Sequence, residues 1–180
     1  MNMKLFLIED ELEDAKAIEH AVTEFSDITD ESGENWHFVL EHLPGKEEVR
    51  IDGKSFRFYT EIILEELQNI IKKQAENEHI GLLLDIVLTN DEYESKYAGS
   101  YPILRLAPEI YKRFKRELPI YIITSVSSFY TNSERIMGID LSECFINKEM
   151  LTEYKLKSAI DKLQNFFVNW SNDDALSAQK

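Results

Sequence analysis

Three short apolar runs stand out along the chain, and each is bounded by polar residues or by glycine or proline. They are Lys4–Ile8, Ile80–Leu84 and Ile120–Ile123. Runs of this length predict buried strands of a parallel sheet, because helices cover both faces of such a sheet. Two further segments, Trp36–His42 and Cys144–Ile146, are weaker strand candidates.

Apolar residues at three- and four-residue steps predict amphipathic helices between these strands. The predicted helices are Glu11–Phe25, Thr60–Gln74, Pro108–Leu118, Ser133–Met137 and Thr152–Trp170. Strands that alternate with helices indicate an α/β fold in which a parallel sheet is doubly wound, with helices on both faces.

One segment breaks the alternation. Glu47–Ile51 and Lys54–Phe58 flank Asp52-Gly53, which is a strong turn signal for a β-hairpin. We therefore expect an added hairpin between the second strand and its helix. The sequence contains no internal repeat, and we expect one domain over residues 1–170 followed by a polar tail over 171–180.

Composition narrows the range of functions. The chain has 180 residues, of which 43% are hydrophobic and 30% charged, as in ordinary globular proteins. No apolar run reaches the roughly 18 residues of a membrane-spanning helix, and no signal-peptide pattern is present, so we expect a cytoplasmic protein without a membrane partner. The net charge of −14 argues against nucleic acid as a partner.

Polar side chains follow four of the predicted strands. They are Glu9-Asp10, Asp85, Thr124-Ser125 and Asn147-Lys148. Ligands of open α/β sheets bind beyond the carboxyl ends of the strands, so these groups are expected to form one site. Carboxylates that converge repel one another, and Mg²⁺ relieves this repulsion with the oxygen ligands it prefers. A metal, a hydroxyl and an ammonium group would also stabilise phosphoryl transfer to a carboxylate nucleophile.

The sequence resembles the receiver domains of two-component response regulators. The resemblance lies in four motifs that occur in the family's order: Leu7-Ile8-Glu9-Asp10-Glu11, Leu82-Leu83-Leu84-Asp85, Pro119–Ser125 and Phe145-Ile146-Asn147-Lys148. It implies a flavodoxin-like five-stranded parallel sheet of strand order 2-1-3-4-5. It also implies a phosphorylation-dependent switch rather than an enzyme, which takes its phosphoryl group from a histidine kinase or phosphotransfer protein.

The resemblance also implies roles for single residues. Asp85 would be the phosphoacceptor, and Mg²⁺ would be held by Glu9, Asp10, Asp85 and the backbone carbonyl of Val87. Lys148 would contact the phosphoryl group. Thr124 would move toward the phosphoryl oxygens, and Phe145 would occupy the switch aromatic position.

The chain departs from the family pattern at Glu149, where a proline usually follows the lysine. The loop between Asp85 and Gly99 is also long and polar. These departures favour an alternative, a receiver-like binding module that works without phosphorylation. A metal-dependent hydrolase with Asp85 as nucleophile is disfavoured, because such enzymes usually place a second aspartate at the position of Val87. The sequence leaves open the downstream protein and whether the chain forms a homodimer.

Overall fold

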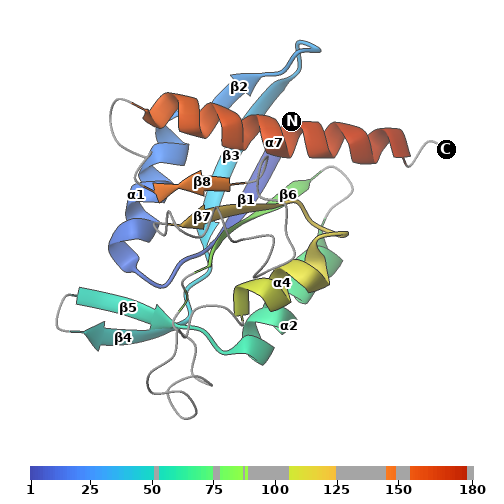
Figure 1. Ribbon diagram of the computed structural model, residues 1–180. Coiled ribbons are helices and arrows are strands. Elements are labelled where there is room, and N and C mark those ends of the chain that lie inside the picture. Colours follow the sequence, from blue (N-terminus) through green and yellow to red (C-terminus); the bar gives the residue numbers. More distant parts are fainter. Residues whose placement is uncertain are drawn as a thin grey trace.

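The computed structural model describes residues 1–50, 53–74, 78–86, 88, 106–124, 145–148 and 155–177, with the backbone alone at Arg50, Phe145 and 173–177. Within these residues the protein is an α/β fold around a mostly parallel sheet of six strands (Figure 1). The strands are β1 (Asn2–Ile8), β2 (Asp27–Thr29), β3 (Asn35–His42), β6 (His79–Asp85), β7 (Ile120–Thr124) and β8 (Phe145–Asn147). Their order across the sheet is β2-β3-β1-β6-β7-β8.

The central strands are buried on both faces, as their apolar sequences predict. β1 pairs in parallel with β3 on one side and with β6 on the other, and β6 pairs in parallel with β7. All five residues of β7 are buried. All five predicted strands are therefore present, within a residue or two of their predicted ends.

Four helices cover the sheet in the described residues: α1 (Leu12–Glu24), α2 (Thr60–Lys73), α4 (Leu106–Phe114) and α7 (Leu156–Ser177). Figure 1 shows α1 and α7 on one side of the sheet and α2 and α4 on the other. None of these described helices is both long and apolar enough to cross a membrane.

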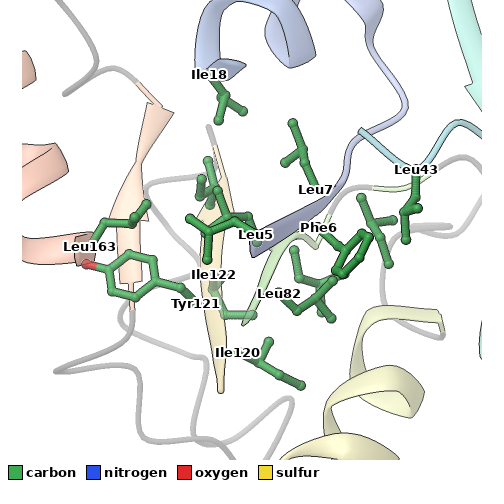
Figure 2. Close-up of a cluster of buried hydrophobic side chains, with 14 of the residues drawn as sticks. Leu5, Phe6, Leu7, Ile18, Leu43, Leu82, Ile120, Tyr121, Ile122 and Leu163 are labelled. Carbon is green, nitrogen blue, oxygen red and sulfur yellow. The ribbon is translucent and has the colours of Figure 1, made fainter. Parts of the chain in front are cut away.

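Side chains from both faces of the sheet form the core. Leu5 and Leu7 of β1 lie toward Ile18 of α1, and Phe6 lies on the opposite face (Figure 2). Gly81 of β6 marks a close approach, because a Cβ atom at this position would overlap the ring of Phe167 on α7. The absence of a side chain at Gly81 therefore allows α7 to pack directly on the sheet.

The predicted hairpin is present as β4 (Lys46–Arg50) and β5 (Gly53–Arg57), which form a separate two-stranded sheet. Gly53 has a φ of 137°, a backbone conformation that favours glycine at the turn. The hairpin is fastened to the residues just before α1 by a β-bridge between Ser55 and Glu11, in which the backbone N–H of Phe56 donates to the carbonyl of Asp10 over 2.7 Å. It therefore lies next to the loop that follows β1.

Three expectations need correction or stay open. The sheet has six strands rather than five, because β2 adds an antiparallel edge beside β3. Helix α7 continues to Ser177, past the predicted end at Trp170, so the first part of the predicted tail is helical. The predicted helix at Ser133–Met137 lies outside the described residues.

Candidate functional site

Three acidic side chains gather at the carboxyl ends of β1 and β6. Glu9 and Asp10 follow β1, and Asp85 is the last residue of β6. All three are buried, and each offers a carboxylate oxygen that lies within 4.8 Å of those of the other two. The parallel pairing of Ile8 with Leu84 explains this proximity, since it brings the two strands to an end side by side.

Lys148 is the cation that faces this cluster. Its Nζ lies 2.6 Å from Oε2 of Glu9 and 2.9 Å from Oδ2 of Asp85. The lysine directly follows β8, and its side chain is only 12% exposed. One ammonium group thus joins two carboxylates from different strands.

The charges at the site are unbalanced. Burial, together with the neighbouring charge of Asp85, raises the pKa of Glu9 to about 8, although Lys148 acts in the opposite direction. Burial alone would lower the pKa of Lys148, but the attraction of Asp85 and Glu9 raises it overall well above its ordinary value. In the described part of the chain, three acidic groups thus gather around one ammonium group, and a further cation would relieve the repulsion between them when they ionise.

Of the other residues predicted for the site, the structure describes only some. Thr124 is fully buried at the end of β7, one position beyond the partner of Asp85 in the β6–β7 register. The backbone of Phe145 begins β8 opposite Ile122, and its side chain lies outside the described set. Val87, Gly99 and Glu149 also fall outside it.

Sequence reasoning missed two residues that contact the site. Oδ2 of Asp14, in the first turn of α1, lies 2.9 Å from Nζ of Lys148. Acidic residues are common in the first turn of a helix, so the sequence alone gives no sign that Asp14 has a further role. Nε2 of His42 lies 2.9 Å from the backbone carbonyl oxygen of Glu9. Because a carbonyl oxygen only accepts hydrogen bonds, Nε2 carries the proton. His42 ends β3, so its position at a strand end was a usable signal.

The residues present suit a hard divalent cation. Carboxylate oxygens are the ligands Mg²⁺ prefers, and the oxygens of Glu9, Asp10 and Asp85 lie close enough together to share one ion. The same groups could act on a phosphoryl group, since Asp85 is a potential nucleophile held beside an ammonium group. The arrangement can therefore bind a cation and an anion next to each other.

Comparison with known proteins adds information on the fold. No family model matches the chain, and neither does any curated protein. Among solved structures, the chain is similar to a fusion protein that carries the trimeric coiled coil of yeast Spc42. The identity is 12% and the TM-score 0.52, over 99% of this chain and 89% of that one. It is also similar to NtrX from Brucella abortus, with 14% identity and a TM-score of 0.49, over 97% of this chain and 30% of that one. At 12% identity, the likeness to the fusion protein concerns the fold alone.

Proposed function

We propose that this protein is a receiver-type signalling switch that accepts a phosphoryl group on Asp85 with the help of Mg²⁺. The observation that carries the proposal is the position of Lys148, whose Nζ lies 2.9 Å from Asp85 and 2.6 Å from Glu9. An acceptor carboxylate, a neighbouring acidic cluster and a buried ammonium group are the parts that this chemistry needs.

The sheet supports the same proposal. Apart from the short edge strand β2, the strands run parallel in the order β3-β1-β6-β7-β8. Numbered along the chain without β2 and the hairpin, this order agrees with the flavodoxin-like arrangement 2-1-3-4-5. In this arrangement β1 and β6 flank the point where the strand order reverses, and the acidic cluster lies at their carboxyl ends.

Glu9, Asp10 and Asp85 would hold Mg²⁺ at this point. The bound ion would offset the charge of the carboxylates and of the incoming phosphoryl oxygens. The three residues would bind the ion jointly, because each offers one carboxylate oxygen as a ligand. The repulsion between the three carboxylates would fall when the cation is present.

In the proposed reaction an oxygen of the Asp85 carboxylate attacks the phosphorus atom of a phosphohistidine on a histidine kinase or phosphotransfer protein. A phosphorus–oxygen bond forms, and the phosphorus–nitrogen bond breaks with its electron pair left on the imidazole. Lys148 balances the negative charge on the transferred group, and Thr124 donates its hydroxyl hydrogen to a phosphoryl oxygen.

The product is an acyl phosphate that alters the surface offered to a downstream protein in the cytoplasm. Phosphorylation would act by shifting the population between two arrangements of that surface, with Thr124 as the residue that senses the phosphoryl group. The protein would then be a phosphoacceptor rather than an enzyme with a separate substrate.

Intact mass spectrometry tests the proposal directly. The wild-type protein and Asp85→Asn are incubated with a small phosphodonor, with and without Mg²⁺. The proposal expects a mass gain of one phosphoryl group in the wild type that requires Mg²⁺ and is absent in Asp85→Asn. No gain in a wild-type protein that is folded by circular dichroism would overturn it and favour a binding module that works without phosphorylation.

A further inference from the structure

Lys148 has a third carboxylate partner that lies outside the acidic cluster. Its Nζ is 2.9 Å from Oδ2 of Asp14, as close as it is to Oδ2 of Asp85. Asp14 comes from the first turn of α1, 134 residues before the lysine. The contact therefore joins the start of a helix to the end of the strand β8.

Asp14 differs from the other two partners in its surroundings. Its side chain is 46% exposed, whereas those of Glu9 and Asp85 are buried. It also does not belong to the group of acidic residues whose oxygens could hold one cation. Asp14 is thus free to pair with Lys148 while Glu9 and Asp85 bind other charges.

A lysine side chain has four rotatable bonds and loses much conformational entropy when it is fixed at one place. Within the site, Glu9 and Asp85 cannot be constant anchors for Lys148 if they bind a metal ion and a phosphoryl group in the proposed function. A carboxylate that takes part in neither interaction is needed to keep the ammonium group in place. Asp14 has this position and this charge.

We propose that Asp14 is a positioning residue that holds the ammonium group of Lys148 over Asp85 during phosphoryl transfer. This inference rests on the proposed function and concerns one contact within it. In this role Asp14 acts only through the lysine. Because the contact is half exposed, its effect on the rate should be moderate, about five-fold.

The test compares Asp14→Asn and Asp14→Glu with the wild-type protein. Asp14→Asn keeps the size of the side chain and removes its charge, and Asp14→Glu restores the charge. We expect the rate of phosphoryl adduct formation with the small phosphodonor and Mg²⁺ to fall about five-fold in Asp14→Asn and to recover largely in Asp14→Glu. In a Lys148→Met background, Asp14→Asn should cause no further decrease, because the two residues act as a unit.

A second readout follows the lysine itself. The rate at which acetic anhydride modifies Lys148, measured by peptide mass spectrometry at one pH, should rise in Asp14→Asn. The matched control is Asp161→Asn, which removes the partner of Lys157 in an exposed pair of 3.1 Å on α7 and changes the net charge by the same amount. This control should leave both the adduct rate and the modification of Lys148 unchanged.

The outcomes separate this inference from the proposed function. A wild-type protein that gains no phosphoryl group overturns the function and, with it, the role of Asp14. A wild-type protein that gains the group while Asp14→Asn does so at the same rate, or with unchanged modification of Lys148, overturns the positioning role alone. An equal loss of rate in Asp161→Asn would reduce the effect to net charge and also overturn it.

Discussion

The backbone N–H of Phe56 donates a hydrogen bond of 2.7 Å to the backbone carbonyl of Asp10, which fastens the inserted hairpin to the loop that carries two of the acidic residues. The ring of Phe56 also packs edge-on against His42, with 5.1 Å between the ring centroids. His42 in turn donates to the carbonyl of Glu9. The hairpin is thereby connected to the backbone of both acidic residues.

These contacts predict that Phe56→Ala affects both stability and the site. Loss of a buried phenyl ring should lower the free energy of unfolding by about 3 kcal/mol, and the loosened loop should bind Mg²⁺ more weakly. Urea denaturation and calorimetric titration measure the two effects. Val49→Ala is the control, since this side chain of the same hairpin is 81% exposed, and its change should stay within about 0.5 kcal/mol. Equal effects of the two substitutions would contradict the anchoring role of the phenyl ring.

The raised pKa of Glu9 predicts a pH dependence of stability in the metal-free protein. The folded protein keeps the proton on Glu9 up to about pH 8, whereas the unfolded chain releases it near 4.5. Between these values the folded state binds more protons, so its free energy of unfolding decreases as pH rises. From pH 6 to pH 8 we expect a loss of roughly 2 kcal/mol that is absent in Glu9→Gln. Parallel pH profiles of the two proteins in urea denaturation would be inconsistent with a raised pKa.

The same proton should be released when Mg²⁺ binds. A cation beside Glu9 favours the carboxylate form, so near pH 7 binding should displace about one proton per ion. Isothermal titration calorimetry in two buffers that differ in ionisation enthalpy measures this number. Glu9→Gln should bind the ion without proton release, and a wild-type value near zero would show that Glu9 does not change its protonation at the site.

Packing at Gly81 gives a prediction about the fold that is independent of the site. A Cβ atom in Gly81→Ala would overlap the Phe167 ring and lie 2.9 Å from the side chain of Leu5. We expect a loss of about 2 kcal/mol in the free energy of unfolding, because the buried ring has to shift. Phe167→Leu should reduce this loss when the two changes are combined, which a thermal or urea double-mutant cycle would detect. Strict additivity would mean that Gly81 does not limit the approach of α7.

The sequence was sufficient to predict those strands and helices whose pattern of apolar residues matches the faces that are buried in the fold. β6 and β7 consist almost entirely of apolar residues because both of their faces are covered, and short runs of this kind are typical of buried parallel strands. β2 was missed because it contains a single apolar residue, Ile28, and is held by its pairing with β3 rather than by its own sequence. The turn between β2 and β3 depends on Asp30, whose carboxylate accepts hydrogen bonds from Ser32, Glu34 and Trp36.

The site was predictable where it depends on strand ends and not where it depends on a helix. Glu9, Asp85 and Lys148 follow apolar strands, and the rule for parallel sheets was enough to bring them together. Asp14 has no such marker, because an acidic residue in a first turn is already explained by the helix dipole. Asp14 is connected with the site through its contact with the Lys148 side chain, and this contact is visible only in three dimensions.

The contact of 2.6 Å between Glu9 and Lys148 has a consequence for how the protein folds during synthesis. β1 emerges first during synthesis, yet the strand that carries its cationic partner is the last of the sheet. Until β8 docks, the carboxylates at the end of β1 and β6 face each other without their ammonium group, and ordering them requires closure of a very long loop. The acidic cluster therefore meets its ammonium group only in chains that have completed folding, so under the proposed function a nascent or partly unfolded molecule should accept the phosphoryl group poorly.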